Sequence, residues 1–331
     1  MKYSVIVPVF NRPDEVDELL ESLCSQTHKD FEVIIVEDGS QKPCKDVCDK
    51  YASILDLHYY YKDNSGPGQS RNYGAERAQG EYLLILDSDV VLPEKYMEHV
   101  EQSLTADTAP AFGGPDAAHP SFTPVQKAIS YSMTSFFTTG GIRGGKKKLD
   151  KFYPRSFNMG IRRDVYLQLG GFSKMRFGED IDFSYRIVEA GYQPRLFPEA
   201  WVWHKRRTDF RKFFRQVYNS GIARINLEKR HPGTLKLVHL LPTVFTVGVF
   251  GLLIGWLLTA CHLLLLPILI YCLIILIHST MENKSLWVGI LSIPAAFVQL
   301  MGYGFGFIDS WWKRCILGRD EFQAFEKNFY K

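Results

Sequence analysis

Two aspartates, Asp87 and Asp89, have the residue type and the spacing to bind a metal ion. They follow an apolar run at 82–86 that predicts a buried strand, so both side chains should emerge at the edge of a sheet. Carboxylates at i and i+2 in an extended or turning segment can bind one divalent cation, Mg²⁺ or Mn²⁺, and the diphosphate that it carries. A second string of the same spacing, at 180–182, falls on a predicted helix, where i and i+2 point to different faces. Position therefore favours Asp87 and Asp89.

The adjacent acids Glu179 and Asp180 are candidates for proton transfer. They precede a predicted helix whose apolar face includes Ile181, Tyr185 and Val188. Acidic residues in a first helical turn commonly stabilise the helix dipole. A carboxylate held at a helix start toward a cleft can also take a proton from a hydroxyl group. Both interpretations fit the residues alone.

Three other polar residues have a structural and a functional interpretation. Asp38, after the second predicted strand, is a turn former or helix cap, or it accepts the imide N–H of uracil or a similar base. Arg71, near a predicted helix start, is a solvated helix residue or a phosphate ligand. His204 is a structural histidine, a third metal ligand or a contact to the diphosphate.

The elements that must position these residues predict an α/β fold. Apolar runs near 3–9, 31–36, 57–61 and 82–86 alternate with predicted helices. This order predicts a mainly parallel, Rossmann-like sheet with helices on both faces and ligand-binding loops at the carboxyl ends of its strands. The sequence has no GxGxxG string after the first strand and no Walker A string, which argues against dinucleotide and P-loop nucleotide binding.

The C-terminal third predicts a membrane region. The 331-residue chain has a net charge of only +3, yet 237–281 and 285–308 contain no Asp, Glu, Lys or Arg. A bilayer core of about 30 Å needs roughly 20 apolar residues per helix. The stretches therefore predict two or three spans, near 238–258, 261–277 and 286–308. A set of buried core helices is the alternative interpretation.

The distribution of charge predicts the orientation in the membrane. Residues 201–236 hold ten basic residues against Asp209 and Glu228, which under the positive-inside rule favours a cytoplasmic N-terminal domain. The N-terminus lacks a signal-peptide pattern, and the six cysteines form no CxxC pair, as expected of reduced thiols. The amphipathic segment from Thr208 predicts a helix in the membrane interface or, alternatively, one packed on the N-terminal domain. We expect a multi-pass protein of the cell membrane with a cytoplasmic catalytic domain.

Several strings together resemble the family-2 glycosyltransferases, which have the GT-A fold. They occur in the order typical of that family: VIVPVFNRPDEVDELLESL from Val5, VEDGS from Val36, NSGPGQSRNYGAERAQGEYLLILDSDV from Asn64, MGIRRDVYLQLGGF from Met159, GEDIDFSYRIVEAGY from Gly178 and WVWH from Trp201. Glu37 departs from the family, in which Asp is usual. The resemblance implies a membrane-anchored, inverting glycosyltransferase of the hexosyltransferase type that depends on a metal.

The resemblance also implies roles for the candidate site residues. Asp180, in the Glu179-Asp180 element, is the expected catalytic base. Asp89 and His204 are the expected ligands of the divalent metal, Mg or Mn. Asp38 is expected to contact the nucleobase, with Asp87 on the ribose side. The full expected nucleotide-binding set is Pro8, Phe10, Arg12, Asp38, Arg71 and Asp87.

The expected partners follow from the same resemblance. The sequence lacks the QxxRW string associated with processive polysaccharide synthases, which favours transfer of a single sugar. We expect a nucleotide-sugar donor, with a UDP-sugar favoured, a lipid-linked or envelope-glycan acceptor, the membrane, and no nucleic acid. The alternatives are a nucleotidyltransferase on a similar fold and a catalytically silent membrane scaffold. The intact set of Asp38, Asp87, Asp89 and Asp180 argues against the scaffold.

The expected organisation has four parts. The first part is a GT-A catalytic domain at 1–207, with a nucleotide-binding half (about 1–110) and an acceptor and base half (about 111–207). The parts that follow are a basic amphipathic interface helix at 208–236, two to three transmembrane helices at 237–310 and a tail at 311–331. The glycine-containing segments 112–115 and 138–148 are expected to be a lid, an acceptor-contacting loop or ordinary surface loops.

Overall fold

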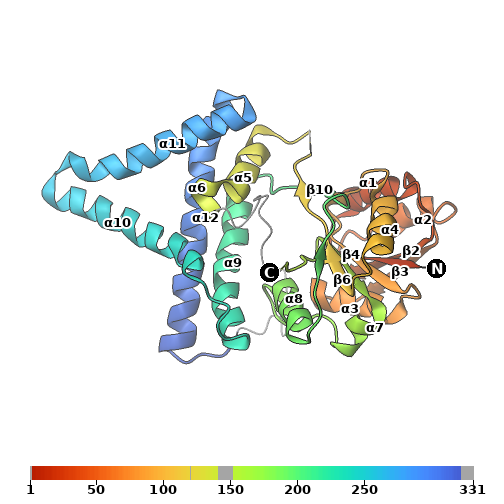
Figure 1. The fold of residues 1–331 in the computed structure, drawn as a ribbon. Coiled ribbons are helices and arrows are strands. Elements are labelled where there is room, and N and C mark those ends of the chain that lie inside the picture. The colour runs from red at the N-terminus through yellow and green to blue at the C-terminus, as the bar shows by residue number, and fades with distance from the viewer. Residues whose placement is uncertain (1, 120, 141–151, 322–331) are drawn as a thin grey trace. The chain divides into compact units, whose positions relative to one another are not determined.

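The computed structural model describes two compact units of this chain (Figure 1). The described residues are 2–119, 121–140 and 152–321. The α/β unit consists of residues 2–119 and 152–205, and the helical unit consists of residues 121–140 and 206–321. Most of the predicted loop at 138–148 and the last ten residues of the predicted tail lie outside the described residues.

The α/β unit contains a seven-stranded sheet of the order β3-β2-β1-β4-β8-β6-β9. β1 pairs in parallel with β2 and β4, and β2 with β3, so the predicted parallel sheet is confirmed. β8 is antiparallel to both of its neighbours. The strands of this sheet are β1 (Tyr3–Val9), β2 (Phe31–Asp38), β3 (Leu57–Lys62), β4 (Tyr82–Leu86), β6 (Ala111–Gly113), β8 (Asn158–Arg162) and β9 (Arg195–Leu196).

Alternate residues of the central strands feed two separate cores. Val5, Val7 and Val9 of β1 face a core that includes residues of α1, α2 and α4. Ile6 and, on β4, Ile85 face a second core that includes residues of α3, α7 and α8. Helices therefore cover both faces of the sheet, as predicted (Figure 1). The helices of this unit are α1 (Pro13–Cys24), α2 (Lys45–Tyr51), α3 (Pro67–Arg77), α4 (Tyr96–Ala106), α7 (Arg163–Gln168) and α8 (Glu179–Glu189).

A second, three-stranded sheet places the last strand of this unit, β10, next to β5, the strand that follows β4. Its middle strand β10 (Val202–His204) is antiparallel to β5 (Val90–Val91) and parallel to β7 (Asp116–Ala117). In this register His204 is opposite Val90. Because Val90 directly follows Asp89, strand pairing alone brings residues more than a hundred positions apart together.

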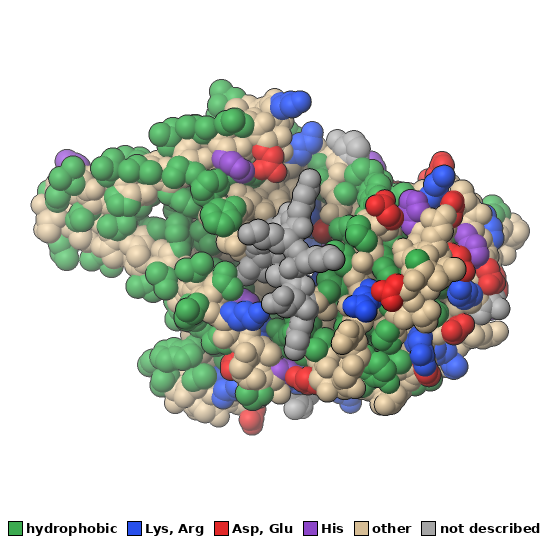
Figure 2. Space-filling model, in the orientation of Figure 1, with side chains coloured by type: hydrophobic (Ala, Val, Ile, Leu, Met, Phe, Trp, Pro, Cys, Tyr) green, Lys and Arg blue, Asp and Glu red, His purple; other side chains and the backbone are tan. Residues whose placement is uncertain are grey.

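The helical unit contains the predicted membrane helices. Three segments are long and apolar enough to cross a membrane: Leu241–Thr259, His262–Asn283 and Leu286–Ile316. In Figure 2 the surface of α10 and α11 is almost entirely hydrophobic, as expected of a region that associates with a membrane. The helices of this unit are α5 (Pro124–Thr134), α6 (Phe136–Thr139), α9 (Phe210–Arg230), α10 (Leu241–Thr259), α11 (Leu266–Asn283) and α12 (Leu286–Trp311), with a π-helical turn at Trp312–Ile316 and short 3-10 turns at Leu237–His239 and His262–Leu265.

Contacts within the helical unit extend into the middle of the sequence. Ala128 of α5 packs with Val288 and Ala295 of α12, and Tyr131 packs with Ile275 and residues of α12. The sequence analysis did not anticipate this grouping, because α5 is only modestly amphipathic and lies far from the apolar stretches. The helical unit is thus built around α12 from two separate segments of the chain.

Candidate active site

Asp87, Asp89 and His204 come together at the end of β4. One ligand atom of each lies within 4.8 Å of the others. Asp87 and Asp89 occupy the turn between β4 and β5, and the pairing of β10 with β5 delivers His204. Two carboxylates and an imidazole suit Mn²⁺ or Mg²⁺. The donor set and its spacing therefore fit a divalent metal, and we call these three residues the metal cluster.

Charged neighbours fix the metal cluster from two sides. The Nη1 atom of Arg12 lies 2.8 Å from Oδ2 of Asp89. The Nε2 atom of His204 lies 3.3 Å from Oδ1 of Asp89, and its Nδ1 atom lies 3.7 Å from Oδ2 of Asp116. A histidine ligand held by a carboxylate on its other nitrogen has a fixed ring orientation. The ring of Phe157, stacked at 4.9 Å between centroids, restricts His204 further.

The metal cluster concentrates negative charge. Burial lowers the pKa of His204, but the nearby carboxylates of Asp116 and Asp89 outweigh burial and raise the pKa to about 9. His204 is therefore protonated at neutral pH and, with Arg12, balances the carboxylates. A divalent cation would meet the same electrostatic need, and it would compete with that proton.

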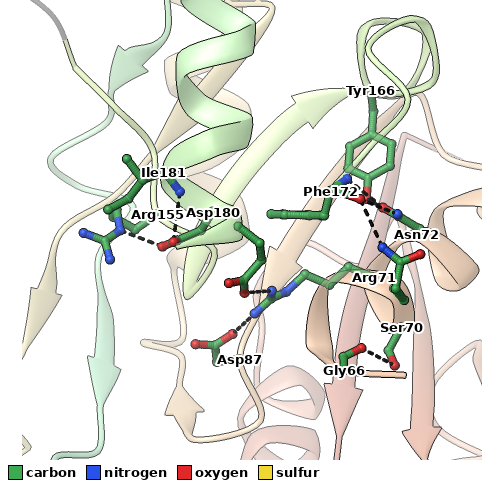
Figure 3. Close-up of polar contacts among 12 residues, drawn as sticks. Gly66, Ser70, Arg71, Asn72, Asp87, Arg155, Tyr166, Phe172, Asp180 and Ile181 are labelled. Atoms are coloured by element: carbon green, nitrogen blue, oxygen red, sulfur yellow. Dashed lines mark hydrogen bonds and ion pairs between the residues drawn. The ribbon is translucent and has the colours of Figure 1, made fainter. Parts of the chain in front are cut away.

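Arg71 links the metal cluster to the second acidic pair (Figure 3). Its side chain is only 4% exposed. Its Nη2 atom donates to Asp87 at 2.7 Å, and its Nη1 atom donates to Glu179 at 3.1 Å. The guanidinium also lies 5.1 Å from the ring centroid of Phe172. Arg71 is thus a buried bridge between two carboxylates, and its predicted contact with phosphate stays a prediction.

The start of α8 fits closely against α3 because of two residues of α3, Gly68 and Asn72. A Cβ atom on Gly68 would lie only 3.3 Å from Cγ of Glu179. Asn72, shown in Figure 3, donates to the backbone oxygen of Phe172 at 2.8 Å and accepts from its backbone nitrogen at 2.8 Å. These contacts hold the chain segment before α8 in place. The sequence GPGQSRN therefore positions Glu179 as well as Arg71.

Asp180 has a different partner from Glu179. The Nε atom of Arg155 donates to Oδ2 of Asp180 at 2.7 Å, and the backbone N–H of Ile181 donates to Oδ1 at 2.9 Å (Figure 3). Burial raises the pKa of Asp180, but the nearby Arg155 outweighs burial and lowers it. Burial and the adjacent Asp180 charge raise the pKa of Glu179. At neutral pH Asp180 is therefore ionised and able to accept a proton.

Asp38 is buried in contacts with the connection between β3 and α3. Its side chain is only 1% exposed. It accepts hydrogen bonds from Lys62 Nζ, from the Ser65 backbone N–H at 2.9 Å and from the Gly66 backbone N–H at 2.8 Å. This arrangement is the turn-and-cap role that was one of its two interpretations. Its predicted contact with a nucleobase stays a prediction.

The loop after β1 adjoins the loop after β2. Pro8 pairs in register with Val36, and Phe10 follows at the end of the strand. Asn11 adopts a positive φ of 55°, which Asn tolerates better than most residues. Its side-chain oxygen accepts from the backbone N–H groups of Gln41 and Lys42 at 2.8 and 2.9 Å. The carboxyl end of β1 thus carries Pro8, Phe10 and Arg12. Their predicted nucleotide-binding role requires a position at this end of the sheet.

Sequence reasoning missed three residues that set the properties of the site: Lys62, Asp116 and Arg155. Each contacts a predicted residue at least 24 positions away. None belongs to a string with a characteristic spacing, so no local signal could identify them. Among the predicted residues, the structure joins Arg12, Arg71, Asp87, Asp89, Glu179 and His204 through direct contacts and places Asp180 beside Glu179.

Comparisons with known proteins identify the family of this chain. Residues 4–170 match the family described as "Glycosyl transferase family 2". The chain belongs to glycosyl transferase family 2. An "Uncharacterized glycosyltransferase" of Haemophilus influenzae is 30% identical over 200 residues, which are 56% of this chain and 62% of that protein. "Glycosyltransferase AglE" of Haloferax volcanii is 24% identical over 250 residues, which are 74% of this chain and 80% of that protein.

The fold is the GT-A fold of such enzymes. The mannosyltransferase PcManGT of Pyrobaculum calidifontis, solved with GDP-Man and Mn²⁺, superposes with a TM-score of 0.64 at 16% sequence identity. The match covers 91% of this chain and 87% of that one. Several curated relatives are much longer proteins, of which this family-2 chain spans only about 15%.

Proposed function

We propose that this family-2 protein transfers a single sugar from a nucleoside-diphosphate sugar to an acceptor hydroxyl with inversion, as a metal-dependent hexosyltransferase. The observation that carries the proposal is the pair of acidic centres joined by one buried arginine. Arg71 holds Asp87 of the metal cluster and Glu179, the neighbour of Asp180. A donor diphosphate and an acceptor hydroxyl need two such centres at a fixed separation.

The metal cluster would hold the Mg²⁺ or Mn²⁺ ion through Asp87, Asp89 and His204. When bound, the ion supplies positive charge that stabilises the diphosphate leaving group. The chain's own contribution is to orient the ligands, through Arg12 at Asp89 and Asp116 at His204. PcManGT, which shares the fold, was solved with Mn²⁺ and a nucleotide sugar.

Asp180 is the proposed base. Its Oδ1 atom is held by the Ile181 N–H and its Oδ2 atom by Arg155, so the carboxylate is ionised and oriented before the acceptor arrives. It takes the proton of the acceptor hydroxyl while that oxygen forms a bond to the anomeric carbon. The bond to the nucleoside diphosphate breaks on the opposite face. One displacement of this kind inverts the anomeric configuration.

The donor would lie across the carboxyl ends of β1, β2 and β4. Pro8, Phe10 and Arg12 border this edge, with Arg71 and Asp87 behind it. We propose that Asp38 orders the β3–α3 connection against the nucleobase, directly or through Lys62, its partner. A UDP-sugar remains our favoured donor on the sequence pattern, and a GDP-sugar is the competing choice that PcManGT raises.

The acceptor is proposed to be a lipid-linked or envelope glycan that reaches the site from the membrane. The support is the helical unit, which carries three segments long and apolar enough to cross a bilayer. In this proposal the protein is a multi-pass protein of the cell membrane, and the α/β unit works in the cytoplasm. The basic residues of α9 would face anionic headgroups.

The test uses the full chain purified in detergent. It measures transfer to a water-soluble acceptor from a panel of UDP- and GDP-sugars, with and without Mn²⁺, and reads the anomeric configuration of the product by NMR. We expect a single glycoside of inverted configuration that requires the metal. A product that carries a nucleotidyl group would support the nucleotidyltransferase alternative, and a product of retained configuration would overturn the inverting mechanism.

The variant Asp180→Asn isolates the base. It should lose transfer while it still binds the nucleotide sugar, as measured by the thermal shift that the donor produces with Mn²⁺. Asp164→Asn is the matched control, because Asp164 is an exposed aspartate that pairs with Arg162 on the surface of the same unit. Full transfer by Asp180→Asn would overturn the assignment of the base.

A further inference from the structure

Helices α9 and α12 of the helical unit run parallel and in contact along most of their length (Figure 1). Near the start of α9, Phe210 and Val298 of α12 both pack against the cluster that contains Phe213 and Val217. Near their ends, Lys229 Nζ donates to the backbone oxygen of Arg314 at 2.7 Å. Residue numbers increase together along both helices, from the contact of Val217 with Gly302 to that of Lys229 with Arg314.

Glycines make this contact unusually close. A Cβ atom on Gly302 would lie 2.5 Å from Cγ2 of Val217, and one on Gly306 would lie 2.0 Å from the backbone oxygen of Tyr218. On α9, a Cβ atom on Gly221 would lie 2.2 Å from the backbone oxygen of Tyr303. The two backbones are therefore in contact, and the pair can only move as one body.

α9 does not fit the hydrocarbon core of a bilayer. It has six basic residues and one acidic residue in 21 positions. Arg211, Lys212 and Arg215 are exposed, and the Lys212 side chain is 66% exposed. They lie on the half of α9 whose Phe213 and Val217 pack beside Val298 and Gly302, in the middle of α12. If α12 crossed the membrane, these charges would lie at hydrocarbon depth, where charged side chains are rare and costly.

α12 also differs from α10 and α11 in its surroundings. Of the 18 consecutive residues with the highest hydropathy, 11% are buried in each of the α10 and α11 segments. In the α12 segment 39% are buried. The exposed large apolar residues of α12 lie near its two ends, on the face opposite α9: Leu286, Trp287, Ile290, Ile308 and Trp311. A helix with a charged neighbour on one side and an apolar stripe on the other matches the water–lipid boundary.

We propose that the chain crosses the membrane twice, through α10 and α11, and that α9 and α12 lie together on the bilayer surface. α10 has 19 residues, so at 1.5 Å per residue it is about 28 Å long, close to the thickness of the hydrocarbon core. The stripe of α12 faces the lipid tails, and the exposed cations of α9 meet anionic headgroups. The turn at Ala260–Leu265 then lies on the far side, and the end of α12 returns to the side of α9.

The contacts of the last described residues agree with two crossings. Arg230 at the end of α9 forms an ion pair with Glu321 at 2.9 Å. Tyr218 donates to Asp309 at 3.0 Å, and Lys313 pairs with the same carboxylate at 2.8 Å. The polar segment after α12 is thus bound to α9, and α9 follows the α/β unit directly in the chain. This inference does not depend on the proposed catalytic function.

Natural cysteines make the test direct. Cys261 lies in the turn between α10 and α11, Cys315 lies just after α12, and both are exposed. The full-length protein, with Cys24 and Cys272 replaced by serine and with only one of the two exposed cysteines kept, is placed in sealed vesicles of known orientation. A membrane-impermeant maleimide is then added from each side. Lys50→Cys on the exposed surface of α2 marks the side of the α/β unit.

We expect Cys315 to be labelled from the same side as Lys50→Cys, and Cys261 from the opposite side. Labelling of Cys315 from the opposite side would show three crossings and overturn the proposal. Protection of Cys261 from both sides until detergent is added would show a re-entrant hairpin and overturn the two crossings. Lys284→Cys is the matched control, because two and three crossings both place it with the α/β unit. A thermal unfolding curve like that of the unchanged protein confirms that each variant is folded.

Discussion

The two acidic centres of the α/β unit contain similar residues and have opposite electrostatic settings. In the metal cluster, Asp87 and Asp89 are balanced by Arg71, Arg12 and the protonated His204. In the Glu179-Asp180 pair, each carboxylate has its own arginine, yet one pKa is raised and the other lowered. Carboxylates whose pKa values are driven apart can take different roles at the same pH. In the proposed mechanism the first centre holds positive charge and the second accepts a proton.

The largest expected contrast comes from matched Asp→Asn changes in the two centres. Asp89→Asn removes a charged ligand, so we expect it to lose both Mn²⁺-dependent nucleotide binding and transfer. Asp180→Asn should keep nucleotide binding and lose transfer by about 10²–10⁴-fold, the usual contribution of a general base. Isothermal titration of the nucleotide with Mn²⁺ and a transfer assay separate the two. Equal loss of binding in both variants would show that the centres are not distinct.

The second prediction concerns Arg71, because its side chain contacts both acidic centres. Arg71→Met leaves Asp87 and Glu179 without their shared buried partner, and removal of one member of a buried ion pair typically costs about 3–5 kcal/mol. We expect a large fall in thermal stability of the α/β unit and loss of transfer. The control is Arg162→Met, an exposed arginine that pairs with Asp164. A stable, active Arg71→Met protein would contradict the bridge.

How far the sequence predicts this arrangement depends on the range of the interactions. The β-branched run of β1 and the apolar run of β4 carry their own pattern, so both strands and the Asp87 turn were predictable. The antiparallel direction of β8 was not, because pairing partners are chosen by the whole sheet. Similarly, Asp38 and Asp180 were visible as acids after a strand and at a helix start. Their partners Lys62 and Arg155 were not, since nothing in the local sequence marks them.

The helical unit shows the same limit. Apolar length alone predicted α10, α11 and α12 as equivalent candidates for spans. The close contact of α12 with the charged α9 depends on glycines at positions 221, 302 and 306, which meet only in the folded chain. The composition of a helix indicates how hydrophobic it is, but it does not indicate which other helix packs against it.

The pH dependence of transfer in Arg155 variants tests the difference between the two acidic centres. Because Arg155 lowers the pKa of Asp180, the ionised base persists as the pH falls. Arg155→Met should raise that pKa, so the acid limb of the kcat/KM profile moves to higher pH. At acid pH we expect roughly a tenfold loss for each unit by which this pKa rises, because only the ionised base is active, with recovery at alkaline pH. Arg155→Lys should restore part of the acid limb, and a uniform loss at every pH would indicate a structural role only.

Glu179→Gln should have the smallest effect and therefore tests the difference within the acidic pair. The amide oxygen of Gln can still accept from Arg71, so the bridge to Asp87 persists in weaker form. Loss of a charged acceptor in one hydrogen bond costs about 1 kcal/mol, or roughly fivefold in kcat/KM. The acid limb set by Asp180 should keep its position, because Asp180, and not Glu179, is the proposed base. If Glu179→Gln instead lost transfer as completely as Asp180→Asn, the two carboxylates would act as one unit, and the proton would have to be assigned to the pair.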